Sequence, residues 1–284
     1  MVKKFEKLMG KFLWAASGKV LRVPIGEVVN LPESGGLGLP CVKSMCCSLM
    51  LSQLLRLLDS GDSKSVGHVG YWIGEVLGDL VVGLDGGEHA EVLPEYFSQL
   101  VDLVVDAKAS GLISGGGWRA IRNKNIYGVH AKNFTVPKVE REAGLDYKKV
   151  WRLLLSPVLT AQSRDVLFLL IHNKLPVRER LFRIGLLVDP YCQYCPCGIL
   201  EDVEHFFCAC DRVSEVWGWI RGKLIGLLGW NNAAVSNWEL INLFLPGSTK
   251  RKELVWMLGT YLAKVWEEVH VRGKTSVRWE TFFE

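Results

Sequence analysis

The chain contains no uninterrupted apolar run long enough to cross a membrane. Its most apolar stretches, residues 48–58 and 76–84, both carry charges and fall far short of the roughly 20 residues that a spanning helix needs. Residues 1–20 have charged side chains throughout and no unbroken apolar segment, so they do not resemble a secretory signal. We therefore expect an intracellular protein in a reducing compartment, nuclear or cytoplasmic, with no membrane partner.

The sequence also has a small net charge and lacks an internal repeat. The formal net charge is only +4 over 284 residues, and the basic residues are spread along the chain, which permits a nucleic-acid partner without requiring one. A composition that is 49% hydrophobic and 23% charged excludes wholesale disorder. We find no internal repeat and few segments with the alternating pattern of a strand. The predicted fold class is therefore mostly α.

Apolar residues at helical spacing indicate where the helices lie. After Pro40, the positions Met45, Leu49, Leu54 and Leu58 follow a period close to 3.6, which predicts an amphipathic helix. A helix over 163–187 is expected to break at Leu175–Pro176, because proline cannot continue a helix. Further helices are predicted at 96–111, at 147–155, from a cap at Asp211 to 229, and at 250–274.

Residues 192–217 collect five of the eight cysteines and one of the six histidines. In a reducing compartment such a cluster favours a metal site over disulfides. Structural zinc takes four ligands, mostly cysteine thiolates and histidine nitrogens. Cys192 and Cys195 have the spacing of a tight turn that presents two thiolates, and His205 and Cys210 can return from the next helix. These four residues predict a closed Zn²⁺ site of the Cys-Cys-His-Cys type.

Two further cysteines leave alternatives open. Cys197 could replace Cys195, and Cys208 could replace Cys210, although Cys208 lies only two residues beyond His205. A plainer interpretation of the cluster is a group of reduced thiols that bind no metal. A redox switch is a third interpretation. A closed four-ligand site has no open coordination position and therefore excludes metal catalysis. The remaining cysteines are predicted to be small buried apolar residues: Cys41, Cys46 and Cys47.

The order and spacing of this segment resemble a known family. The elements Leu175–Arg178, the cysteine pair, Glu204–Phe207, Cys210 and Trp217 resemble the zinc-binding region at the C-terminus of reverse transcriptases of LINE-type, non-LTR retrotransposons. The N-terminal segment is similar to the part of these proteins that follows the polymerase palm. That similarity rests on Phe12, Trp14, Lys19, Arg22, Pro32, Gly35, Gly36, Leu37 and Gly38. Together the resemblance covers about 1–58 and 146–275.

The resemblance implies three segments. Residues 1–60 would be a helical thumb-like segment following the palm, 61–145 a connecting region of uncertain fold, and 146–284 a helical domain built around a small zinc knuckle. In the family, the fingers, palm and endonuclease precede this region. Polymerase chemistry needs paired aspartates for two metal ions, and the chain has no Asp-Asp dipeptide. We therefore expect no enzymatic activity.

In the family this region engages RNA template and target DNA, so the resemblance implies a nucleic-acid partner. Basic residues on helix faces are the candidate phosphate contacts: Arg178, Arg180, Arg183, Lys250, Arg251 and Lys252. A second hypothesis is a protein-interaction scaffold, in which the apolar face of 45–58 contacts a polymerase palm or another partner. A third is a decayed gene fragment with no selected function.

Overall fold

The computed structural model describes residues 2–13, 23–78, 80, 93–113, 121–131, 136–143, 147–196, 198–229, 235–244 and 251–271. The chain divides into two compact units. The first unit comprises Met1–Phe12 and Leu39–Phe134, and the second comprises Leu13–Gly38 and Thr135–Glu284. The prediction of a mostly α protein is confirmed, since the described residues form helices and, outside them, one isolated bridge between Tyr191 and Leu200.

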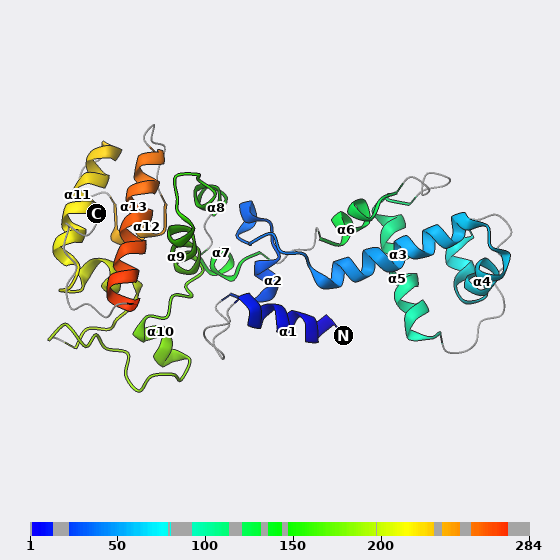
Figure 1. The fold of residues 1–284 in the computed structure, drawn as a ribbon, viewed down its shortest axis with the longest axis horizontal. Helices are drawn as coiled ribbons and strands as arrows, with labels where there is room; N and C mark the ends of the chain where they lie inside the picture. The colour runs from blue at the N-terminus through cyan, green and yellow to red at the C-terminus, as the bar shows by residue number, and fades with distance from the viewer. Residues whose placement is uncertain are drawn as a thin grey trace. The chain divides into compact units, whose positions relative to one another are not determined.

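The first unit is built around one long helix, α3. Its helices are α1 (Val2–Leu13), α3 (Val42–Ser60), α4 (Ser63–Leu77), α5 (Glu95–Ala109) and α6 (Asn123–Ala131). Figure 1 shows α6 lying along α3 and α5 crossing it. The helix α3 ends at Gly61, whose φ of +68° is readily adopted by glycine, and Asp62 then caps α4 by accepting a hydrogen bond from the Ser65 backbone N–H at 3.3 Å.

The apolar face of α3 is largely covered within this unit. Leu51, Leu54 and Leu58 are buried in a core that they share with α4 and α5. Met45 and Leu49 are exposed, so the predicted face is narrower than its sequence pattern indicated. The cysteine prediction for this helix is wrong: Cys41 and Cys47 are half-buried and Cys46 is exposed. Contact between 45–58 and a palm or partner stays a prediction.

The second unit packs three helices side by side. In Figure 1, α13 lies between α9 and α11. The buried faces include Leu167 of α9, Ile220 of α11 and Leu258 of α13. The elements of this unit are α2 (Ile25–Val28), η2 (Pro32–Ser34), α7 (Lys138–Ala143), α8 (Lys148–Leu154), α9 (Ala161–Ile171), α10 (Arg178–Arg183), η4 (His205–Ala209), α11 (Ser214–Leu228), α12 (Asn237–Ile241), α13 (Arg251–Val265) and η5 (Trp266–Val271).

Most predicted helices of this unit are found, and one predicted cap is wrong. The break at Leu175–Pro176 falls between α9 and α10. Asp211 does not cap α11, because the helix begins at Ser214 and its N-cap residue is Val213, which makes no side-chain capping bond. The three residues between Cys210 and Ser214 instead belong to the surroundings of the cysteine cluster.

The glycine-rich loop at 31–38 packs against α8 and α9 of the second unit. A Cβ on Gly35 would lie 2.7 Å from the Trp151 ring, and one on Gly36 would overlap the backbone carbonyl of Asn30, so neither position accepts a larger residue. The Nε2 of His172 lies 2.8 Å from the Gly35 carbonyl oxygen. The structure thus groups this loop with the predicted zinc domain, and the thumb-like role of 1–60 stays a prediction.

A buried acid–base pair lies beneath this loop. The Nδ1 of His172 is 3.3 Å from a carboxylate oxygen of Glu27, and the other oxygen accepts a hydrogen bond from the Lys138 backbone N–H at 3.1 Å. Burial by itself would raise the pKa of Glu27, but the contacts with His172 and Lys138 outweigh it and lower that pKa. The pair therefore joins α2, α7 and the end of α9 through an ionised carboxylate.

Across the described residues, no helix combines the length and apolar character that crossing a membrane requires.

Candidate metal centre

Two short structures present the four candidate ligands. Cys192 and Cys195 lie in the loop after α10, where the Cys192 N–H donates to the Ile199 carbonyl at 2.8 Å and the Tyr191–Leu200 bridge closes the turn. His205 opens η4, a π-helical turn, and the Cys210 N–H donates back to the His205 carbonyl at 2.8 Å. This bond spans five residues, and it brings the two side chains to the same side of the turn.

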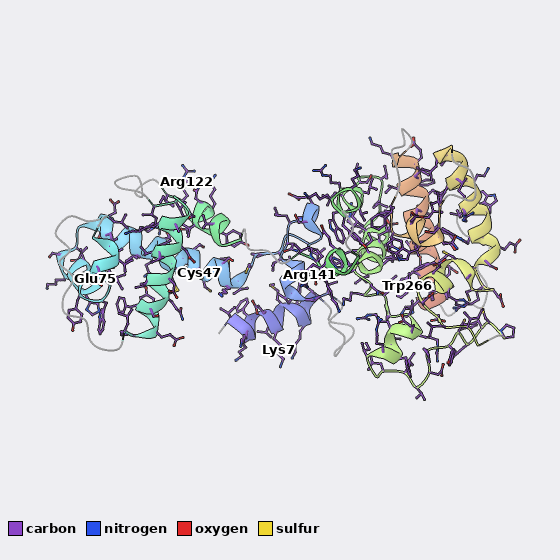
Figure 2. All side chains as sticks on the ribbon, turned by 180° about the vertical axis from the view of Figure 1, so that it is seen from behind. Lys7, Cys47, Glu75, Arg122, Arg141 and Trp266 are labelled. Atoms are coloured by element: carbon purple, nitrogen blue, oxygen red, sulfur yellow. The ribbon has the colours of Figure 1, made fainter. Side chains whose placement is uncertain are left out.

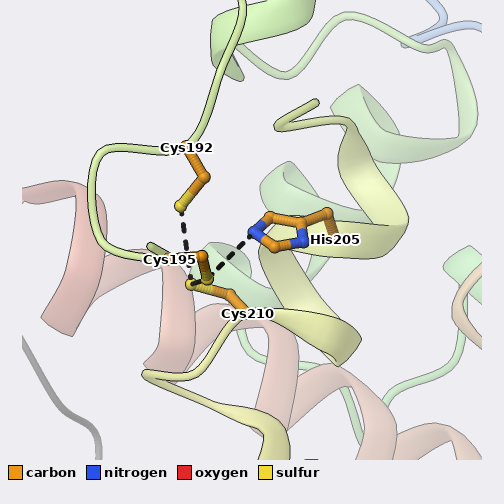
Figure 3. Close-up of side chains that lie close together, drawn as sticks. All are labelled: Cys192, Cys195, His205 and Cys210. Carbon is orange, nitrogen blue, oxygen red and sulfur yellow. Dashed lines mark hydrogen bonds between the residues drawn. The ribbon is translucent and has the colours of Figure 1, made fainter. Parts of the chain in front are cut away.

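The four ligand atoms of Cys192, Cys195, His205 and Cys210 lie within 4.8 Å of one another, and all four residues are buried. The Cys210 sulfur is 3.8 Å from the sulfurs of both Cys192 and Cys195. The Cys195 sulfur is 3.5 Å from Nε2 of His205. Figure 3 shows the imidazole and the three thiols converging on one point from the loop and from the two ends of η4.

These separations are those of a zinc tetrahedron. With Zn–S bonds of about 2.3 Å and a Zn–N bond of about 2.0–2.1 Å, an ideal tetrahedron places two sulfurs ~3.8 Å apart and a sulfur ~3.5 Å from nitrogen. The cluster shows 3.8 Å for two sulfur pairs and 3.5 Å for one sulfur–nitrogen pair. No disulfide links these cysteines. The donor set therefore fits one tetrahedral ion with four protein ligands.

Without a bound cation, burial disfavours the ionised, thiolate form of these cysteines. It raises the pKa of Cys192, and it raises the pKa of Cys195 to about 12. Three thiolates around one point would also repel one another. A divalent cation reverses this balance, because a thiolate is the ligand form and the metal displaces its proton.

Two groups next to Cys210 donate to the sulfurs. The Asp211 backbone N–H points at the Cys195 sulfur at 3.4 Å, and Nε of Arg212 points at the Cys210 sulfur at 3.3 Å. A zinc ion with three thiolates and a neutral imidazole carries a net charge of −1, so a buried guanidinium beside it is electrostatically favourable. Such outer contacts orient the ligands and adjust their basicity.

Arg212 is itself held on two sides. Its guanidinium lies 3.7 Å above the ring of Tyr194 and 3.7 Å from a carboxylate oxygen of Glu201. The other oxygen of Glu201 accepts the backbone N–H of Arg178 at 3.2 Å. Glu201 thereby ties the first residue of α10 to the cysteine cluster, and both Glu201 and Arg212 are buried.

The histidine side of the cluster is anchored to the helical core. The His205 backbone N–H donates to Asp202 Oδ1 at 2.6 Å, and the next two residues, Phe206 and Phe207, are buried. The Tyr261 hydroxyl of α13 donates to the Phe207 carbonyl. Trp266, labelled in Figure 2, lies beside both phenylalanine rings. The turn that carries His205 is therefore packed onto α13.

Comparison with known proteins agrees with this geometry. Residues 132–217 match the family model described as zinc-binding in reverse transcriptase. This segment of the chain is similar to the zinc-binding domain of reverse transcriptases. The match spans α7 to the start of α11 and includes all four residues of the cluster. No curated protein and no solved structure matches the chain.

The structure brings Cys192, Cys195, His205 and Cys210 together as the spacing predicted, although their role as ligands stays a prediction. Cys208 is outside this group; it is buried, and burial raises the pKa of its thiol. Cys197 lies outside the described residues, so its place as an alternative to Cys195 also stays a prediction.

The residues predicted to bind nucleic acid differ in their exposure and in their ion pairs. Arg178 forms an ion pair with Asp189 at 2.9 Å, and Arg180 is buried. Arg183 is more than half exposed and pairs with Glu179 at 3.3 Å. Of the three candidates at 250–252, Lys250 lies outside the described residues, Arg251 is the first residue of α13, and Lys252 is exposed.

Sequence reasoning missed the groups that surround the predicted sites. Arg212 could have been found, because a buried three-thiolate zinc site needs a nearby cation and Arg212 is two residues beyond the last ligand. The carboxylate of Glu201 then follows as the partner that a buried arginine requires. Lys138 and Lys174 gave no local signal, since only the packing of α7 and α9 brings them near α10.

Proposed function

We propose that this chain is the zinc-binding region at the C-terminus of a LINE-type retrotransposon reverse transcriptase, and that it binds nucleic acid without catalysing a reaction. The observation that carries the proposal is the tetrahedral spacing of the four ligand atoms inside the segment that matches the reverse-transcriptase family. RNA template and target DNA are the proposed partners.

A structural rather than catalytic metal follows from the ligand count. Three thiols and one imidazole supply the four positions that structural zinc uses, and catalytic zinc keeps one position for water or substrate. The cluster is buried and is packed between α10, α11 and α13. The ion would therefore fix the loop at 192–200 and the turn at 205–210, and through them the orientation of α10.

Nucleic-acid binding is supported by the position of cations relative to this framework. The helix α10 carries Arg183 on an exposed face, and α13 begins with a basic pair at Arg251 and Lys252. Cations at a helix N-terminus are unfavourable for the helix itself, which favours an external anion there. Contacts of this kind recognise phosphates regardless of base sequence.

Native mass spectrometry of the reduced chain, with and without a chelator, tests the zinc module. We expect one zinc per chain and loss of helicity on chelation, because structural zinc contributes folding free energy directly. Fluorescence anisotropy with a labelled single-stranded RNA, and with the matching DNA, tests the partner. We expect affinity to fall steeply as salt rises. A chain that holds zinc and binds neither strand would refute the nucleic-acid role and leave the zinc module intact.

A further inference from the structure

A basic pocket lies next to α10 in the second unit. It has a volume of about 430 Å³ and is lined by Lys138, His172, Lys174, Arg180 and Arg183, together with Val139, Asn173 and Ile184. The cations come from three separate segments: the first residue of α7, the chain just after α9, and α10. Among the described residues that line it, none is acidic.

Two acidic side chains beside this pocket pair with residues that line it. Glu179 pairs with Arg183 at 3.3 Å, and Glu27 pairs with His172 at 3.3 Å. These two ion pairs engage His172 and Arg183 among the five basic lining residues. Burial lowers the pKa of Lys174, and the charges of Arg180, Lys138 and Arg183 lower it further, against the opposing effect of Glu27. Each of these cations would be stabilised by an anion in the pocket.

We propose that this pocket, lined by Lys138, Lys174, Arg180 and Arg183, holds a phosphodiester group of a nucleic-acid strand. The proposal rests on the proposed function, and it adds Lys138 and Lys174, which the nucleic-acid prediction did not include, to Arg180 and Arg183, which it did. The pocket volume falls within the range of about 300–1,000 Å³ that is usual for small-ligand sites, so a sugar or base can enter with the phosphate.

The basic side chains of the pocket suit the backbone phosphates of a strand rather than one particular base. Lysine ammonium and arginine guanidinium groups are strong phosphate donors, and charge-assisted hydrogen bonds are about twice as strong as neutral ones. Arg183 is more than half exposed and can follow a strand out of the pocket, whereas Arg180 is buried in its wall. Because α10 is held by Glu201 next to the cysteine cluster, the metal site would keep these two arginines in place.

The test compares two double variants of the full chain with the same loss of charge. Lys174→Gln with Arg183→Gln removes two pocket cations, and Lys149→Gln with Lys223→Gln removes two exposed cations of α8 and α11 that do not line the pocket. The probe is a short fluorescein-labelled oligouridine, measured by anisotropy between about 50 and 200 mM salt. Zinc stoichiometry and circular dichroism confirm that both variants fold.

We expect the pocket variant to bind about tenfold more weakly, and its plot of log affinity against log salt to be shallower by about 0.7 for one lost phosphate contact, or ~1.4 where Arg183 reaches the next phosphate of the strand. The control variant should change less than about threefold, because screened charges act weakly over distance.

Equal binding by the wild type and the pocket variant would overturn the pocket assignment and leave the proposed function standing. Failure of the folded, zinc-loaded wild type to bind either oligouridine or the matching DNA strand would overturn both. In that case, inorganic pyrophosphate that raises the melting temperature of the wild type but not of the Lys174→Gln, Arg183→Gln variant would assign the pocket to a free phosphate ligand instead.

Discussion

Replacing Cys210 and Cys208 separately by alanine distinguishes a metal site from a group of buried thiols. Both cysteines are buried and lie two residues apart, so the two variants lose the same atoms from similar surroundings. Only Cys210 belongs to the cluster, where its sulfur is 3.8 Å from two other sulfurs and receives the Arg212 N–H. The pair is therefore a matched comparison.

The expected size of the effect follows from the ligand count. Structural zinc sites bind with about 10–16 kcal/mol in total, so one ligand of four accounts for roughly 2.5–4 kcal/mol on average. At 1.4 kcal/mol for each factor of ten, Cys210→Ala should weaken zinc binding by about 100-fold or more. The loss also leaves the buried Arg212 without its sulfur acceptor, which adds to the cost. Cys208→Ala should leave zinc affinity within about threefold, at a packing cost that lowers stability alone.

Two measurements check this comparison. Competition with a chromophoric chelator gives the relative zinc affinities, and cobalt substitution gives a thiolate-to-metal absorption band whose intensity reflects the number of bound sulfurs. We expect three thiolates in the wild type and in Cys208→Ala. Retention of wild-type zinc affinity and of the full cobalt band by Cys210→Ala would refute the four-ligand assignment, and so would an equal loss in both variants.

Three further outcomes are expected. Arg212→Met should lower zinc affinity by about 10–100-fold, measured by the same competition, because an outer-shell donor is lost. Gly36→Ala should lower the melting temperature markedly, whereas Gly222→Ala, on an exposed and open face of α11, should raise it slightly. The folded-state pKa of Glu27 is lowered from its ordinary value of 4.5, so its contribution to stability is present above about pH 4.5 and is lost as the pH falls through the folded-state value. Denaturation followed against pH, with Glu27→Gln as the comparison, should show a shallower acid loss in the variant.

Each of these three predictions has an outcome that would contradict it. Unchanged zinc affinity in Arg212→Met would mean that the guanidinium serves packing alone. Equal melting temperatures for the two glycine variants would contradict the close approach of the loop backbone at Gly36. Identical acid denaturation with and without Glu27 would show that its carboxylate does not contribute to the pH dependence.

Local signals in the sequence identified the helices and the cluster. Helical periodicity located α13 because its apolar face is continuous, and the proline at 176 marked the break between α9 and α10. The short spacing of Cys192 and Cys195, and the five-residue step from His205 to Cys210, carried enough geometry to select the four residues that meet. Such patterns depend only on neighbouring residues.

What the sequence did not reveal depends on residues far apart along the chain. Trp256 lies within the apolar pattern of α13 but is exposed, because its position is outside the face that packs. The glycine loop packs onto Trp151 and His172, more than 100 residues later, and nothing near the loop indicates that contact. The basic pocket likewise forms only when α7, α9 and α10 meet.

Glu201 divides its two carboxylate oxygens between Arg178 and Arg212. Glutamine has the same length but only one carbonyl oxygen, so it would turn an amide N–H toward one of two groups that can only donate. Aspartate keeps both oxygens but is one methylene shorter. Position 201 therefore has no conservative replacement, although its side chain is not one of the four candidate ligands.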